Sequence, residues 1–162
     1  MGDSLAIAVI GTFDSKAEEH MFLKERIEQR GFRALTINVG IKSPSPVPVE
    51  LDLFELITRD DKSVAERRDE AIHAVLQQAR AQIKRLFEDG DICGIISAGG
   101  GTGTHICTTI MRELPLGVPK VMISTVASRN MAEIVSTKDI TMIHSVVDLL
   151  GLNSISGSIL DK

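Results

Sequence analysis

The sequence predicts an α/β fold in which a doubly wound, mainly parallel sheet of the flavodoxin or Rossmann type is covered by helices, giving three layers. Apolar runs such as residues 5–11 and 92–96 are continuous rather than alternating, which is typical of strands buried on both faces. These runs alternate with segments of helical periodicity, which favours parallel strands joined by helices. We expect the strand order 2-1-3-4-5, with the switch point, where ligands bind, between the first and third strands.

The elements follow from local patterns along the chain. Strands are expected at residues 5–11, 33–39, 94–97, 120–124 and 140–143, and helices at about 14–30, 63–88 and 104–114 and from about 127. Asp14 and Ser15 can cap the first helix, and Gly31 ends it. Residues 41–61 hold three of the five prolines, which predicts an irregular crossing loop with a short helical turn or edge strand at residues 53–57.

Composition limits the classes of protein to which the chain can belong. Its 162 residues suit a single domain, 1–162, with a sizeable aliphatic core, since 43% are hydrophobic and only 3% aromatic. A net charge of −4 and the scarcity of aromatic side chains, five Phe and no Trp or Tyr, argue against nucleic-acid binding. No apolar run reaches the ~20 residues that span a bilayer, and residues 1–4 do not resemble a signal peptide. Cys93 and Cys107 fit reduced core thiols, and we expect a cytoplasmic protein.

A glycine-rich run at the end of the third strand is the most informative motif. It consists of Gly99, Gly100, Gly101, Thr102, Gly103 and Thr104. Glycines let backbone N–H groups approach a ligand closely, and the helix that follows directs its positive end to the same place. The run therefore predicts a phosphate or carboxylate site; the alternative is a tight turn without a ligand. It is not a Walker A motif, because no lysine follows, and Thr104 does not fit the dinucleotide fingerprint.

Two more polar loops are expected at the same edge of the sheet. The loop after the first strand supplies Thr12, Asp14 and Lys16. Asp14 can be a helix cap, a Mg²⁺ ligand beside a polyphosphate, or a base, and Lys16 can be a phosphate ligand or a surface residue. The loop after the fourth strand supplies Thr125, Ala127, Ser128 and Arg129, as ligand contacts or as a series of caps.

The histidines give little support to a catalytic function. His105 and His144 lie near the same edge, but a lone histidine in such a place is more often structural than catalytic. His20 and His73 lie in amphipathic helices and need no functional interpretation. The sequence contains no nucleophile elbow and no metal-ligand spacing of histidines and cysteines.

Four sequence blocks carry a resemblance to a known family. They are residues 11–19 (GTFDSKAEE), 99–104 (GGGTGT), 124–128 (STVAS) and 139–153, with DITM and SVVDLLGLN. Together they resemble the N-terminal domain of a family of uncharacterised proteins related to the tomato mosaic virus replication inhibitor. The chain departs from the family pattern at Ser15, Ala17, Gly101, Thr102 and Arg129. Arg129 replaces an expected glycine and can either clamp an anion or fill part of the pocket.

The resemblance implies an ATP-binding domain, followed in the family by a second domain similar to TIM-barrel proteins; the plant member binds a viral replication protein. We therefore expect either the first part of a two-domain protein or a single-domain member. ATP is the expected ligand, with its phosphates on residues 99–104, Thr12 and Lys16 facing them, and Asp14 assisting Mg²⁺. By analogy of fold, residues 38–40 would lie beside the ribose or adenine.

The sequence is also compatible with two other functions. The first is a phosphotransferase, ligase or hydrolase of a small molecule, in which Asp14 works with His105 or His144. The second is a regulatory domain whose nucleotide site acts on a second domain or partner chain. The long helix and the crossing loop offer surfaces for a homo-oligomer, most simply a homodimer.

Overall fold

The computed structural model describes residues 5–59, 63 and 66–162. Residues 1–4, for which the sequence predicts no signal peptide, lie outside the described residues, as do 60–62 and 64–65, where the crossing loop is expected to end and the long helix to begin. Among the described residues, none of the helices combines the length and the apolar character needed to cross a bilayer.

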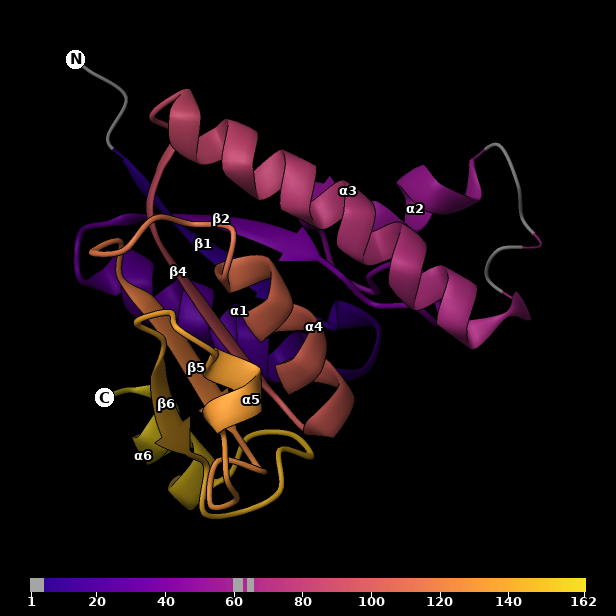
Figure 1. The fold of residues 1–162 in the computed structure, drawn as a ribbon. Coiled ribbons are helices and arrows are strands. Elements are labelled where there is room, and N and C mark those ends of the chain that lie inside the picture. The colour runs from indigo at the N-terminus through magenta and orange to yellow at the C-terminus, as the bar shows by residue number, and fades with distance from the viewer. Residues whose placement is uncertain (1–4, 60–62, 64–65) are drawn as a thin grey trace.

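In the described part of the chain, six parallel strands form one sheet in the order β3-β2-β1-β4-β5-β6 (Figure 1). They are β1 (Ala6–Gly11), β2 (Arg33–Asn38), β3 (Leu51–Asp52), β4 (Ile92–Gly99), β5 (Lys120–Ser124) and β6 (Thr141–His144). The predicted order 2-1-3-4-5 is confirmed as β2-β1-β4-β5-β6, and the two-residue β3 extends the sheet beyond β2. The chain runs outward from β1 to β3 and then crosses back to β4 on the other side of β1, so the order of the strands reverses between β1 and β4, and this pair is the switch point.

Helices cover both faces of the sheet, as predicted. On one face lie α2 (Leu53–Thr58), α3 (Arg68–Glu88), α4 (Gly101–Met111) and the short α5 (Ala132–Val135). On the other lie α1 (Phe13–Gln29) and α6 (Ser154–Leu160), seen behind the sheet in Figure 1. Each face buries its own aliphatic cluster, centred on Ile95 and Ile106 in one case and on Val9 and Leu23 in the other. The sheet is therefore buried on both sides, which explains its continuous apolar runs.

Several boundaries differ from the sequence-based expectation. The fourth helix begins at Gly101, three residues early, so most of the glycine-rich run forms the first turn of α4. The helix expected from residue 127 is a series of turns, and α5 starts only at Ala132. The short helical turn within the crossing loop is confirmed as α2. An additional helix, α6, follows the last strand, where the Asn153 side chain caps it by accepting from the amides of Ile155 and Ser156.

A buried cation stabilises the amino-terminal end of β5, opposite the switch point. Lys120 has a fully buried side chain, and its ammonium donates to the carbonyls of Pro115 and Val118 at 2.7 and 2.8 Å and to Asp139 at 2.7 Å. The hydrogen bonds from Lys120 and from the Gly117 amide lower the pKa of Asp139 to about 2. Because these contacts satisfy the charge within the fold, Lys120 is structural.

Candidate anion-binding cleft

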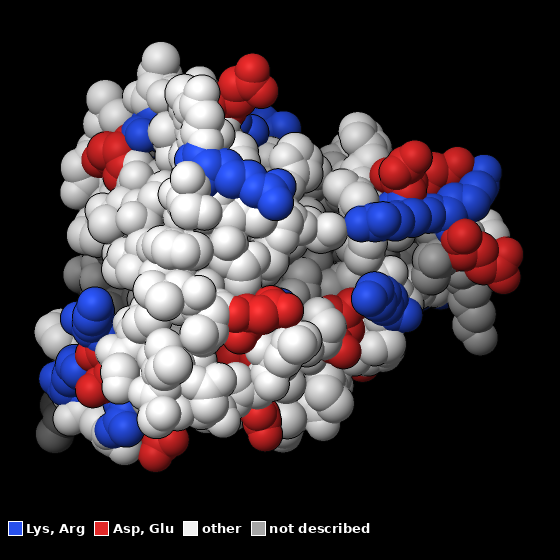
Figure 2. Space-filling view, turned by 90° about the horizontal axis from the view of Figure 1, so that it is seen from below, with Lys and Arg blue, Asp and Glu red and all other residues white. Residues whose placement is uncertain are grey.

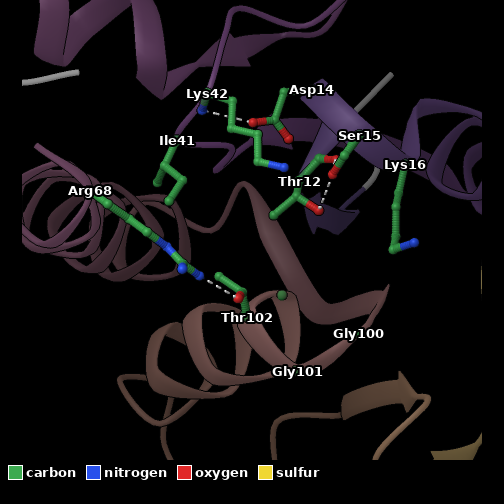
Figure 3. A pocket seen from close by; sticks show the side chains of 11 residues that line it. Thr12, Asp14, Ser15, Lys16, Ile41, Lys42, Arg68, Gly100, Gly101 and Thr102 are labelled. Atoms are coloured by element: carbon green, nitrogen blue, oxygen red, sulfur yellow. Dashed lines mark hydrogen bonds between the residues drawn. The ribbon is translucent and has the colours of Figure 1, made fainter. Parts of the chain in front are cut away.

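A cleft of about 380 Å³ opens between the carboxyl ends of β1 and β4 (Figure 3). Its lining comes from four places in the chain and comprises Thr12, Asp14, Ser15, Lys16, Ile41, Lys42, Arg68, Gly100, Gly101, Thr102 and Gly103. The position is the one expected for a ligand in a doubly wound sheet, and the volume lies in the range of small-molecule sites. The turns that follow β1 and β4 therefore meet across one cavity, as the predicted strand order requires.

The first turn of α4 forms one wall of this cleft. Gly100 is the N-cap residue, and the first amide bonded within the helix is that of Thr104, which donates to the Gly100 carbonyl at 2.8 Å. The amides of residues 101–103 come before this first helical hydrogen bond, so they have no acceptor within the helix. They lie at the positive end of an eleven-residue helix. This wall therefore offers several N–H donors and a helix dipole to a ligand in the cleft.

Three glycines in this turn are not required by the packing of the protein itself. Ideal Cβ atoms at Gly100 and Gly103 would make ordinary contacts, 3.7 Å from Thr125 Oγ1 and 3.8 Å from Thr12 Oγ1, and one at Gly101 would meet nothing within 4 Å. None of the three has a positive φ. Glycine within a helix costs up to about 1 kcal/mol relative to alanine. A ligand that approaches the backbone closely would explain why these three positions carry no side chain.

The opposite wall is the start of α1. Thr12 is the N-cap residue, and the Ser15 hydroxyl donates to its carbonyl oxygen at 3.3 Å. Asp14 does not cap this helix: its Oδ2 accepts the amide of Lys42 at 2.9 Å, which joins α1 to the loop after β2. A Cβ on Gly40 would lie 2.4 Å from the carboxyl carbon of Asp14, so glycine at that position leaves room for the carboxylate.

Two cations that the sequence did not single out extend toward the cleft, while a predicted one is engaged elsewhere. In Figure 3 the Lys42 side chain reaches toward Thr12, and the Arg68 guanidinium donates to Thr102 Oγ1 at 3.0 Å. Lys16 lines the cleft, but its ammonium donates to the carbonyl of Leu149. Lys42 could have been noticed because it closely follows the carboxyl end of β2, whereas Arg68 is one of many charges on a long helix.

The remaining predicted residues lie around the cleft rather than in its lining. Gly99 ends β4 and packs closely, with its ideal Cβ position 3.3 Å from the Cα of Gly103. The Thr104 hydroxyl is buried and lies 2.6 Å from that of Ser124. The Thr125 amide donates to the Gly99 carbonyl at 3.1 Å, so the third loop is tied to the glycine turn. Ala127, Ser128, Arg129, His105 and His144 do not line this cleft.

His20, to which the sequence assigned no function, connects the two walls beneath the cleft. Its Nδ1 lies 2.6 Å from the Lys16 carbonyl, and its Nε2 lies 3.5 Å from the amide nitrogen of Ala98, the residue before Gly99. A carbonyl oxygen can only accept and a backbone amide can only donate, so these contacts require a neutral ring protonated on Nδ1. Complete burial lowers the pKa of the imidazole, which favours the same form.

Comparisons with known proteins place this architecture in a family. Residues 5–162 match the one described as "Uncharacterised protein family (UPF0261) N-terminal domain". A UPF0261 protein of Clostridium tetani is 39% identical over 96% of this chain and 40% of its own length. The tomato "ToMV susceptible protein tm-1(GCR26)" is 27% identical over 99% of this chain and 24% of its own length.

The chain spans about 40% of the length of the bacterial relatives that it matches, such as those of Clostridium tetani and Rhizobium meliloti. Among solved structures, MurG of Acinetobacter baumannii has a TM-score of 0.52 and 10% identity over 93% of this chain and 43% of its own, which shows a shared fold. The four sequence blocks and the match over residues 5–162 agree: the chain belongs to the UPF0261 family and corresponds to its N-terminal domain.

Proposed function

We propose that this domain binds a nucleotide, ATP, with its phosphates against the first turn of α4. The observation that carries the proposal is the group of three glycines, Gly100, Gly101 and Gly103, which leave the backbone on either side of Thr102 uncovered although neither φ nor packing requires glycine there. Bare backbone at a helix N-terminus is the feature by which proteins commonly hold phosphate.

The charges around the cleft suit a polyphosphate better than a single carboxylate. Lys42 and Arg68 approach from two different segments, and Thr102 and Thr12 add hydroxyl groups. Arginine can bind phosphate through two parallel hydrogen bonds, while lysine acts as a mobile point charge. Two cations and a helix N-terminus around one cavity can together neutralise the negative charge of several phosphate groups.

Asp14 fits the role of a Mg²⁺ ligand. It is the one carboxylate among the described residues that line the cleft, and only its Oδ2 is engaged, with the Lys42 amide. The described residues contain no group of three or more acidic, histidine or cysteine side chains placed to hold a metal by themselves. Mg²⁺ is commonly held by one or two carboxylates together with substrate phosphates, so Asp14 would bind the ion that accompanies ATP.

The nucleoside part of the ligand would meet less polar surface. Ile41 is the aliphatic side chain among the described lining residues. Asn38, which the sequence placed near the ribose or adenine, is committed to the fold: its Oδ1 accepts the amides of Phe13 and Gly40, and its Nδ2 donates to Asp52. The contacts of the base are therefore expected from Ile41 and its neighbours.

Calorimetric titration with ATP tests the proposal, and melting temperatures provide a second readout. A ligand present at 100 times its dissociation constant raises the free energy of unfolding by roughly 2.7 kcal/mol. For a domain of this size, the melting temperature then rises by about 5 to 10 °C. No heat and no shift with millimolar ATP, ADP or phosphate would contradict an anion site. Gly101→Val should abolish binding, because its side chain would occupy the phosphate position. Gly157→Val is the matched control, since a Cβ on that helical glycine of α6 also meets nothing within 4 Å.

A further inference from the structure

The ammonium of Lys16 connects the cleft to a distant part of the chain. Lys16 lines the cleft through the start of α1, yet it donates to the carbonyl of Leu149, 133 residues later. The backbone of α1 departs from helical geometry at Lys16, with φ −137° and ψ 41°. The same residue thus belongs both to the wall of the candidate phosphate site and to the attachment of residues 149–152, the segment that leads into α6.

Among the described residues, three side chains of α1 make polar contacts with residues 149–152, and the Ser156 hydroxyl of α6 donates to the Gly151 carbonyl at 3.4 Å. Besides the bond from Lys16, the Gly151 amide donates to Glu19 at 2.9 Å and the Leu152 amide donates to Glu18 at 3.3 Å. The side chain of Leu149 is buried in the α1 face of the core. The attachment is therefore a short series of side-chain contacts rather than a strand or helix ladder, and one of its three polar contacts with α1 depends on Lys16.

The segment also presents apolar surface. Leu150 is 82% exposed, Leu152 42% and Ile155 50%. Figure 2, which shows the molecule from below, has an area left of its centre without Lys, Arg, Asp or Glu, where polar and apolar uncharged residues are both white. A change in how residues 149–152 are held would therefore alter an apolar part of the surface.

We propose that bound phosphate competes with the Leu149 carbonyl for the Lys16 ammonium, so that filling the cleft loosens residues 149–152. The inference rests on the proposed nucleotide site and adds a means of regulation to it. A phosphate oxygen is a charged acceptor and binds an ammonium more strongly than a neutral carbonyl does. The flexible four-carbon stem of lysine lets the charge move without movement of the backbone. Through Lys16, occupancy of the cleft is communicated to the segment that leads into α6.

Amide hydrogen exchange measured by NMR tests this directly, because the Gly151 and Leu152 amides are the ones that donate to side chains of α1. With saturating Mg-ATP, both should exchange on the order of fivefold faster, as expected when one charge-assisted bond that holds the segment is lost. Amides of the central strands, such as Ile95, should keep their exchange rates, which excludes a general loss of stability.

Two variants separate the coupling from binding itself. In Lys16→Met, the amides of residues 151 and 152 should already exchange rapidly without ATP. Saturating ATP should then cause no further increase in their exchange rates. Lys42→Met is the matched control: it removes a cation from the same cleft but has no described contact with residues 149–152, so it should weaken ATP binding and keep the ATP-dependent acceleration.

The outcomes separate the two proposals. ATP binding by calorimetry with unchanged exchange at residues 151 and 152 would overturn the coupling and leave the nucleotide site standing. An equal ATP-dependent acceleration in Lys16→Met would also overturn the coupling, because the ammonium would then play no part in it. A complete lack of ATP binding would overturn both.

Discussion

The imidazole ring of His20 occupies the space that a side chain on Gly11 would need. An ideal Cβ on Gly11 would lie only 1.8 Å from His20 Nε2. The imidazole is completely buried and packs against the ring of Phe13, with the ring centroids 4.9 Å apart and the planes tilted by 32°. Glycine at the last position of β1 thus allows α1 to pack a polar ring against the end of the sheet. The ring in turn connects the Lys16 carbonyl to the Ala98 amide, on opposite sides of the cleft.

This relationship predicts a strong coupling between two substitutions. Gly11→Ala should destabilise the protein by about 1–3 kcal/mol, because the new methyl group must displace the ring. In a His20→Ala background the same substitution should cost little, since the space is then free. Urea unfolding of the parent, both single variants and the double variant gives the interaction energy. Additive effects would show that Gly11 is required for another reason.

Asp14→Asn separates the charge of this side chain from its hydrogen bond. The amide oxygen can still accept from the Lys42 backbone, so the variant should melt within a few degrees of the parent. It should lose the Mg²⁺-dependent strengthening of ATP binding, because Mg²⁺ needs a carboxylate ligand. Titration of ATP into both proteins, with Mg²⁺ and with a chelator, measures the difference. Equal Mg²⁺ dependence would limit Asp14 to joining α1 and residue 42.

Arg68→Ala should weaken ATP binding about fivefold, since an exposed cation contributes only about 1 kcal/mol. Its effect on AMP binding should be smaller, because the proposed role of Arg68 is to share the charge of several phosphate groups. Arg67→Ala is a close control: Arg67 pairs with Glu70 at 2.7 Å and does not line the cleft. Calorimetric titration of each variant with ATP and with AMP tests this prediction. Equal losses of ATP affinity in Arg68→Ala and Arg67→Ala would exclude a local contact between Arg68 and the phosphates.

The Lys120–Asp139 pair predicts an acid-sensitive contribution to stability. The pKa of Asp139 is about 2 in the folded protein, below its ordinary value of 3.8. Stabilisation by its charge should therefore be complete above about pH 4 and be lost as the pH falls toward 2. Asp139→Asn should melt at a lower temperature at pH 7 and show a smaller further decrease between pH 4 and pH 2. Its ATP affinity should equal that of the parent, because the pair lies at the far end of β5.

The sequence was sufficient to predict most of the elements, the order of the strands and the edge of the sheet that carries the cleft, but not α6 or the turns after β5. Continuous apolar runs and helical periodicity are local patterns, and connection rules then allow few arrangements of parallel strands. The glycine turn was found in the same way, since residues 99–104 are contiguous. Its boundary was three residues wrong, because glycine and threonine are poor helix formers and only packing of α4 on the sheet makes them helical there.

Only the tertiary structure decided which side chains meet around that turn. Arg68 reaches Thr102 across 34 residues, His20 reaches Ala98 across 78, and Lys16 reaches Leu149 across 133. No local pattern encodes such pairs, because each depends on the direction of two elements that are fixed only when both pack on the sheet. The sequence therefore predicted the place of the cleft and its backbone donors, and the fold determined its cations and the partner of Lys16.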